Sequence, residues 1–221
     1  MTMRSLALAI GLAQLLVPVC ASAQLSSSEE YAIAIHAVPD VEQGGTIFRN
    51  RCEACHGAYG EGYPGGSAAA FPAIGGQHFR YLVLALIRFR HGRNSTHGMQ
   101  YFSDASRLAT AQDVADVAAY AAALQPLSPV GMGTGLSLRE GAREYLRSCE
   151  SCHGASGEGN AATPVPRLAG QHYRYLLGQL NASAQRNDDP HARRIHELRV
   201  PDREAVADYL SRVLRPFVHG H

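Results

Sequence analysis

The sequence predicts an all-α protein made of two similar domains in tandem. Three observations support this fold class. A motif-bearing segment of the 221-residue chain is repeated about a hundred residues later. Apolar residues recur at helical spacing in both copies, and no stretch shows the sustained alternation that is typical of a strand. A segment rich in Pro and Gly separates the copies and indicates a linker.

The repeat is the strongest of these observations. Residues 52–62 (CEACHGAYGEG) return as residues 149–159 (CESCHGASGEG), and residues 71–82 (FPAIGGQHFRYL) return as residues 165–176 (VPRLAGQHYRYL). An aromatic residue also stands shortly before the first cysteine of each copy. A repeat of this length indicates a duplicated domain, because solenoid units have periods of roughly 20 to 50 residues.

Each copy is expected to contain about three main helices joined by long loops. The last helix of each copy carries an apolar stripe that must face a core, formed by Val114, Val117, Ala118 and Ala121 and by Val206, Tyr209, Leu210 and Val213. The first of these two helices should begin near Thr110. Domains this small bury little apolar surface alone, so a large internal cofactor would complete the core.

The chain divides into a predicted signal peptide (1–23), a first domain (24–124), a linker (125–139) and a second domain (140–221). The signal has Arg4 in a basic start, an apolar run and a small-residue site at Ala21-Ser22-Ala23. The run is too short and too interrupted for a membrane span of about 20 residues. A lipid anchor on Cys20 is the less favoured alternative, because the residues before it are not small. We therefore expect export to the periplasm and no integral membrane segment in the mature chain.

Composition excludes several classes of function. The formal net charge of +1 gives no electrostatic argument for nucleic acid. The chain has no lysine, which removes Schiff-base chemistry. No motif for a nicotinamide, flavin or phosphate site is found, since the Gly-rich stretches do not follow a strand.

The cysteines indicate a covalently bound cofactor. Cys52, Cys55, Cys149 and Cys152 form two Cys-x-x-Cys-His motifs, the attachment signature of c-type haem, in which two thiols bond the porphyrin and the next residue ligates iron. One helical turn would present both sulfurs to one edge of the ring. A redox dithiol, a zinc site or disulfides would fit this arrangement less well. The sequence therefore predicts two haem c groups, with His56 and His153 as iron ligands.

Both halves resemble class I cytochrome c domains, and the duplicated pattern resembles the cytochrome c4 family and the haem subunit of flavocytochrome c sulfide dehydrogenase. The resemblance implies two haem domains packed face to face. It also implies that the carbonyls of Pro72 and Pro166 accept the N–H of the two ligand histidines. The sixth ligand of the first haem would be Met99, which lies shortly before the last helix of that domain.

The second half departs from the family pattern, because no methionine follows Cys149. Alignment with the family pattern brings His191 near the vacant position, so His191 is the first candidate for the sixth ligand of the second haem. His196 is the second candidate, and an open or water-filled position is the third. His78 and His172 occupy equivalent places in the two halves, so we expect them to be structural.

The expected function is electron transfer rather than catalysis. A periplasmic protein with two haems would pass single electrons between a donor and an acceptor, such as a membrane oxidase, a reductase or a dehydrogenase. Two alternatives remain. The chain could be a haem enzyme of the peroxidase or oxidoreductase kind that uses an open second haem, or the dedicated haem subunit of a flavin or quinoprotein dehydrogenase.

Overall fold

The all-α prediction is confirmed by the fold. The computed structural model describes residues 25–65, 71–93, 99–104, 107–125, 131–186 and 190–213. Across these residues the chain forms helices and loops, with two isolated β-bridges in place of strands, Tyr63–Phe71 and Asn160–Val165. The predicted signal peptide (1–23), with Cys20, lies outside the described residues. None of the helices in the described part of the chain is long and apolar enough to span a membrane.

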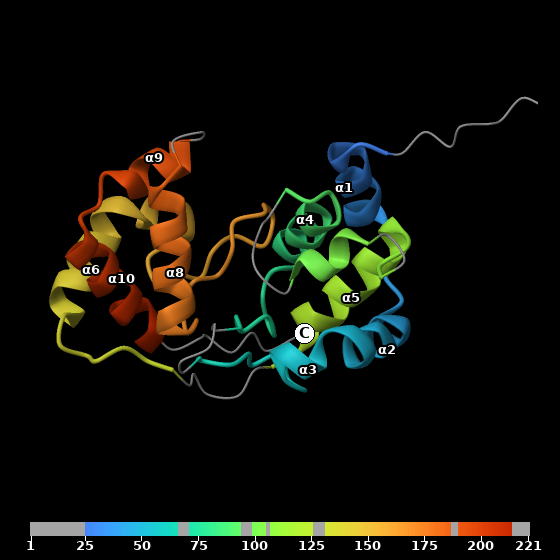
Figure 1. Ribbon diagram of the computed structural model, residues 1–221, viewed down its shortest axis with the longest axis horizontal. Coiled ribbons are helices and arrows are strands. Elements are labelled where there is room, and N and C mark those ends of the chain that lie inside the picture. Colours follow the sequence, from blue (N-terminus) through green and yellow to red (C-terminus); the bar gives the residue numbers. More distant parts are fainter. Residues whose placement is uncertain are drawn as a thin grey trace, which may run out of the picture.

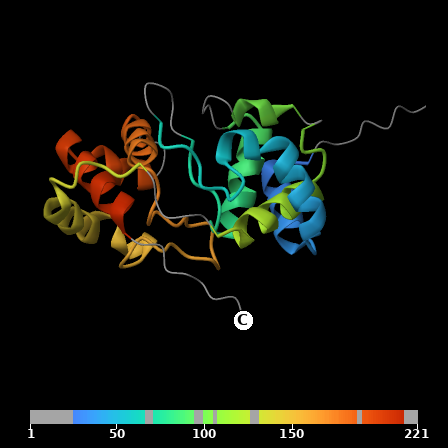
Figure 2. The same ribbon diagram turned by 90° about the horizontal axis from the view of Figure 1, so that it is seen from below.

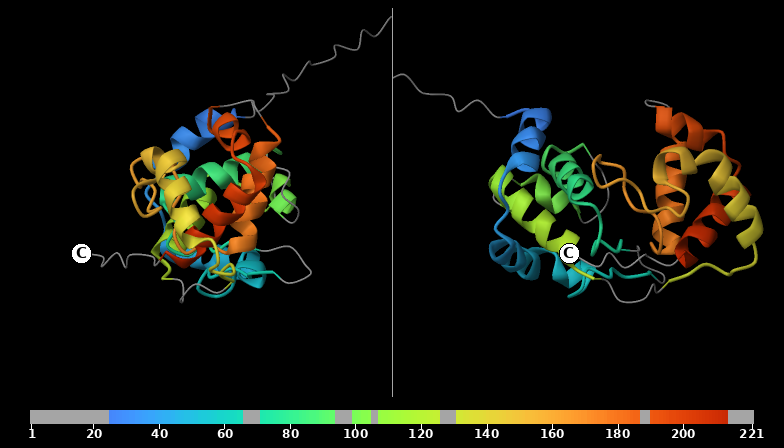
Figure 3. Two further views of the ribbon diagram at one scale, coloured as in Figure 1. Left: turned by 90° about the vertical axis from the view of Figure 1, so that its left-hand side faces the viewer. Right: turned by 180° about the vertical axis from the view of Figure 1, so that it is seen from behind.

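The helices gather into two lobes, which Figure 1 shows side by side. The first contains α1 (Ser27–His36), α2 (Val41–Arg51), α3 (Glu53–His56), α4 (Phe79–Arg90), the 3₁₀ helix η1 (Met99–Ser103) and α5 (Ala111–Ala123). The second contains α6 (Leu138–Ser148), α7 (Glu150–His153), α8 (Tyr173–Ala184), α9 (Pro190–His196) and α10 (Val200–Arg212). Figure 2 and Figure 3 show the same two lobes from other directions.

The duplication is visible in the helices. The three long helices α2, α4 and α5 correspond to α6, α8 and α10, as the repeat predicts. Helix α5 begins one residue after its N-cap Thr110, whose side chain forms a capping box with Asp113. Helices α1 and α9 were not predicted. The first begins with a capping box of Ser26 and Glu29, and the second lies in a charged segment that contains His191 and His196.

A glycine crossing sets the framework of each domain. Helices α2 and α5 cross at Gly44, where a methyl group in place of the hydrogen would lie 2.1 Å from the carbonyl oxygen of Asp116. Helices α6 and α10 cross in the same way at Gly141, where the corresponding distance to the Ala205 oxygen is 2.1 Å. A neighbouring aromatic pair packs at each crossing, Phe48 with Tyr120 and Tyr145 with Tyr209. The small residue thus lets the two backbones approach each other.

Alanine at Gly141 is expected to lower the free energy of unfolding of the second domain by about 1–3 kcal/mol, because α6 must move away from α10 to admit the methyl group. Alanine at Gly178 is the matched control. This position lies in α8 with nothing within 4 Å of an added methyl group, so the change should be neutral or stabilising by up to about 1 kcal/mol. Chemical denaturation followed by circular dichroism measures both. Equal changes in the free energy of unfolding would contradict the claim that Gly141 is required for the close approach of α6 and α10.

A buried ion pair joins α1 to α4 within the first domain. Glu30 is only 4% exposed and pairs with Arg90 at the end of α4. Its other carboxylate oxygen lies 2.8 Å from Nε2 of His91. A buried carboxylate without a cationic partner costs several kcal/mol of stability, so Glu30 requires Arg90 beside it. The pair therefore holds α1 against α4.

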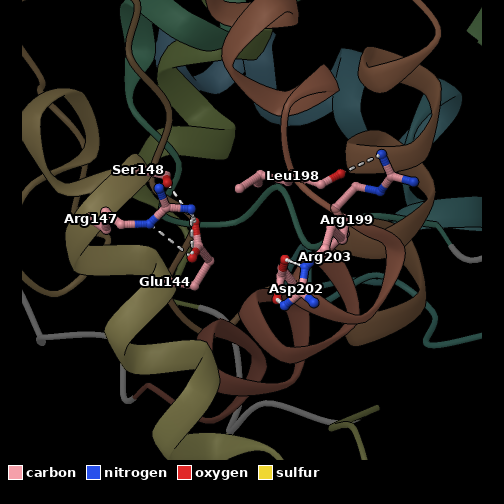
Figure 4. A network of polar contacts seen from close by, with 7 residues as sticks. All are labelled: Glu144, Arg147, Ser148, Leu198, Arg199, Asp202 and Arg203. Atoms are coloured by element: carbon pink, nitrogen blue, oxygen red, sulfur yellow. Dashed lines mark hydrogen bonds and ion pairs between the residues drawn. The ribbon is translucent and has the colours of Figure 1, made fainter.

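Alanine at Arg90 is expected to destabilise the first domain by about 3 kcal/mol, because it leaves the Glu30 carboxylate buried and short of a partner. The control is Asp202→Asn. Asp202 pairs with Arg199 at 2.7 Å in the polar network of Figure 4, but Arg199 is 78% exposed, so the loss should stay below about 1 kcal/mol. Denaturant titrations measure the free energy of unfolding of both variants. Similar losses would show that the buried pair stabilises the protein no more than an exposed one.

The two domains meet through the described parts of the loop after α3 (57–65 and 71–78) and through the loop after α7 (154–172), which lie between the lobes in Figure 1. Gln77, His78, Gln171 and His172 each bond the backbone of the opposite domain. The second part of the predicted linker, from residue 131 on, is fixed to α10. There, Gly135 N donates to the Asp208 carboxylate at 2.8 Å, and Arg212 donates to the Gly133 oxygen at 2.6 Å.

Candidate functional site

The two predicted attachment motifs form equivalent single turns. Cys52 ends α2 and precedes α3, and its carbonyl oxygen accepts from the N–H of Cys55 at 3.1 Å and of His56 at 2.9 Å. Cys149 does the same for Cys152 at 3.2 Å and His153 at 3.0 Å. In each motif the backbone thus turns once between the first cysteine and the histidine, as the predicted attachment requires.

The first cysteine of each motif is more buried than the second. All four are free thiols in the described structure. Burial raises the pKa of Cys52 to about 12 and that of Cys149 to about 11, whereas Cys55 and Cys152 are exposed. Burial thus disfavours the thiolate form of Cys52 and Cys149.

The two predicted iron ligands are held as neutral imidazoles. His56 and His153 are 5% and 7% exposed. Nδ1 of His56 lies 2.9 Å from the Pro72 oxygen, and Nδ1 of His153 lies 3.1 Å from the Pro166 oxygen. Burial lowers the pKa of both rings, and in His153 the nearby His191 lowers it further.

This hydrogen bond sets the tautomer of each ring. A carbonyl oxygen only accepts, so Nδ1 must carry the proton, and Nε2 keeps the lone pair that a metal binds. Both histidines thus fit an axial ligand of haem iron, and the two prolines occupy the places that the resemblance implies for them.

His191 lies opposite His153 in the second domain. It occupies the second position of α9, and the centroids of the two rings are 5.9 Å apart at an interplanar angle of 57°. Bonds from imidazole nitrogen to a metal are about 2.0–2.1 Å long, so two imidazoles on opposite sides of one metal have ring centroids about 6 Å apart. The spacing of His153 and His191 therefore suits one iron between them.

His196, the second candidate, is engaged elsewhere. Its Nδ1 lies 2.7 Å from the Ala184 oxygen at the end of α8. The ring lines a surface hollow together with Leu198, Arg199 and Arg203. Helix α9 thus directs His191 toward His153 and His196 toward α8.

Met99 lies in the first domain at the start of η1. Its side chain is half-buried and packs against the apolar cluster that contains Phe102 and Leu108, which are 4% and 2% exposed. The residues just before Met99, 94–98, lie outside the described residues. Met99 therefore belongs to the wall of the first domain's interior.

Sequence reasoning missed the glutamine that precedes each of the two repeated histidines. His78 and His172 are N-cap residues of α4 and α8, in keeping with the structural role expected of them. The signal for the glutamines was present in the repeat, because Gly-Gln-His occurs at the same place in both halves, as residues 76–78 and 170–172.

Comparisons with known proteins agree with this arrangement. A family model described as cytochrome c matches residues 41–125 and 138–213. A cytochrome c4 of Azotobacter vinelandii is 33% identical over 150 residues, which cover 58% of this chain and 65% of that protein. A protein of Stutzerimonas stutzeri named thiosulfate dehydrogenase electron acceptor is 35% identical over 173 residues, covering 73% of this chain and 78% of that one.

A solved structure gives the same result. The reduced recombinant cytochrome c4 from Pseudomonas stutzeri superposes with a TM-score of 0.66 and 26% identity. The superposition covers 80% of this chain and all of the other. The two-domain arrangement described above is therefore that of a known protein with two domains of this kind.

Proposed function

The chain belongs to the cytochrome c family as a dihaem electron-transfer protein resembling cytochrome c4, and we propose that it works in the periplasm as a carrier between two redox proteins. Its two haem c groups cycle between ferric and ferrous iron. The protein supplies the axial ligands, a water-poor pocket and a surface for docking. The predicted signal peptide supports the location.

The proposed attachments follow the two motifs. Cys52 and Cys55 bond the first haem, and His56 and Met99 ligate its iron. Cys149 and Cys152 bond the second haem, and His153 and His191 ligate its iron. The carbonyls of Pro72 and Pro166 orient the two proximal rings.

The ligand sets give electron flow a direction. A thioether favours ferrous iron and raises the potential of a haem, whereas a second imidazole favours ferric iron. A haem held by His153 and His191 would therefore have the lower potential, and electrons entering the molecule there would pass downhill to a haem held by His56 and Met99. The 5.9 Å spacing of the two imidazoles carries this proposal, because it disfavours an open catalytic position at the second haem.

For the electron donor we propose a periplasmic dehydrogenase, with thiosulfate dehydrogenase as the first to test. The support is the 35% identity to a protein named as the electron acceptor of that enzyme. The acceptor would be a respiratory oxidase or reductase.

The test is a redox titration of the purified mature protein, followed by rapid mixing with thiosulfate dehydrogenase and thiosulfate. In the titration we expect two one-electron steps per chain at separate potentials, with low-spin spectra throughout. In the rapid-mixing experiment we expect the lower-potential haem to be reduced before the other. Hydrogen peroxide should be consumed no faster than by a single-haem cytochrome. Rapid peroxide turnover, or high-spin second haem in the native protein, would favour the enzyme alternative instead.

A further inference from the structure

Two buried glutamines cross from one domain to the other. Gln77 precedes α4 and is 8% exposed, and Gln171 precedes α8 and is 6% exposed. Neither bonds a ligand or attachment residue of its own domain in the described structure. Each instead bonds the loop that follows the Cys-x-x-Cys-His motif of the opposite domain. Their effect is therefore expected in the opposite domain.

The contacts of the two glutamines are the same in both directions. Gln171 accepts the N–H of Ala73 at 2.8 Å and donates to the Ala73 oxygen at 2.9 Å. Gln77 accepts the N–H of Arg167 at 2.9 Å and donates to the Arg167 oxygen at 2.9 Å. These partners fix the orientation of each amide, because its oxygen faces N–H donors and its nitrogen faces a carbonyl.

The N–H that each glutamine binds belongs to the peptide unit that orients a proximal histidine. The N–H of Ala73 and the carbonyl of Pro72 are the two ends of one peptide group, and that carbonyl lies 2.9 Å from Nδ1 of His56. A continuous path of hydrogen bonds thus runs from Gln171 through this peptide group to the ring of His56. The path from Gln77 through the Pro166–Arg167 peptide to His153 is its counterpart, with 3.1 Å in its last step.

We propose that Gln171 and Gln77 are positioning residues that act across the domain boundary. Gln171 tunes the haem of the first domain, and Gln77 tunes the haem of the second. The inference rests on His56 and His153 as proximal ligands, but it does not depend on the ligand role of His191 or on the identity of the redox partners.

The physical reason is the polarisation of a shared peptide group. Hydrogen bonds in a chain strengthen one another, so an acceptor on the N–H makes the carbonyl oxygen of the same group a better acceptor. A stronger bond from Nδ1–H makes the imidazole a more basic ligand. A more basic ligand stabilises ferric iron and lowers the potential. Removing the glutamine amide should therefore raise the potential of the haem in the opposite domain.

The experiment compares Gln171→Met and Gln77→Met in the mature protein with both haems attached. Methionine keeps the length of the side chain and removes both hydrogen bonds. We expect Gln171→Met to raise the potential of the first haem, changing its oxidised-to-reduced ratio at fixed applied potential by about three- to tenfold, where tenfold corresponds to 59 mV for one electron. Gln77→Met should do the same to the second haem. Each variant is the matched control of the other.

A second readout separates tuning from general loosening. In the reduced protein, the NMR signal of the Nδ1 proton of His56 should move upfield in Gln171→Met and stay in place in Gln77→Met. If the methionine variants do not fold, Gln171→Glu and Gln77→Glu keep the shape of the side chain. As neutral carboxylic acids at low pH they can still make both bonds, so the potentials should match those of the unmodified protein. At high pH the ionised carboxylate loses its donor to the Ala73 or Arg167 carbonyl, and only the potential of the crossed haem should change.

The crossed pattern decides the outcome. Shifts confined to the haem of the variant's own domain, equal shifts at both haems, or unchanged potentials and Nδ1 signals would overturn the inference. A wild-type protein without low-spin haem would contradict the proposed function before any glutamine variant is made. The failure of one is therefore distinguishable from the failure of the other.

Discussion

Alanine at His191 is expected to convert the second haem from low-spin to high-spin iron with an exchangeable sixth position. The side chain lies 5.9 Å, centroid to centroid, from the buried ring of His153, and nothing of comparable basicity replaces it in alanine. Cyanide should then bind one haem per chain, where the unmodified protein binds none at the same concentration. Absorption and electron paramagnetic resonance spectra of the oxidised protein measure both changes.

His196→Ala is the matched control for this prediction. The two histidines lie on the same short helix, but His196 bonds the end of α8 through the Ala184 oxygen. Its removal should leave the haem spectra unchanged and affect at most the stability of α9. Methionine at position 191 should keep the haem low-spin and raise its potential, within the roughly 0.8 V range that axial ligands span. A high-spin second haem already present in the unmodified protein would refute the assignment of His191.

Loss of both attachment cysteines in the second domain, in Cys149→Ser with Cys152→Ser, is expected to unfold that domain. Its main buried cluster draws on α6, α8 and α10 alone, through Tyr145, Leu176, Val206, Ala207 and Leu210. That of the first domain draws on α1, α2, α4, η1 and α5. A haem inserted in the second domain therefore supplies a larger share of its apolar interior.

The comparison is with Cys52→Ser and Cys55→Ser, which removes the first haem. That variant should retain more of its helical circular dichroism and stay more resistant to proteolysis than the variant at Cys149 and Cys152. Pyridine haemochrome analysis confirms that one haem remains in each. If both domains retained the same helical content and protease resistance after losing their haems, the difference between the two apolar clusters would not affect stability.

Much of this molecule could be predicted from its sequence because it is duplicated. The recurrence of Cys-x-x-Cys-His fixed the number of haem domains, and the helical period with the Thr110 cap located α5 to within one residue. The equivalence of Pro72 and Pro166 came from the family resemblance, and both carbonyls do lie at hydrogen-bond distance from the expected histidines.

The missed features depend on contacts between distant residues. Helix α9 was not among the predicted helices, because its segment is short and rich in arginine and histidine. The burial of Ala192 and Ile195 arises only when the second domain is assembled. The role of Gln77 and Gln171 was missed for a related reason. A buried glutamine that bonds only main-chain groups can face any side chain. The sequence therefore contains no complementary residue that would indicate the contact.

The crossed glutamines make the domain boundary an isologous contact of the kind found in symmetric dimers, where residue i of one subunit meets residue j of the other and the reverse. Position 77 meets position 167, and position 171 meets position 73, its equivalent in the repeat. Because only main-chain atoms are recognised, the change from alanine at 73 to arginine at 167 does not disturb the symmetry. A single unit of the repeat could pair with its own copy by the same bonds, and joining two units in one chain turns a concentration-dependent association into an intramolecular one.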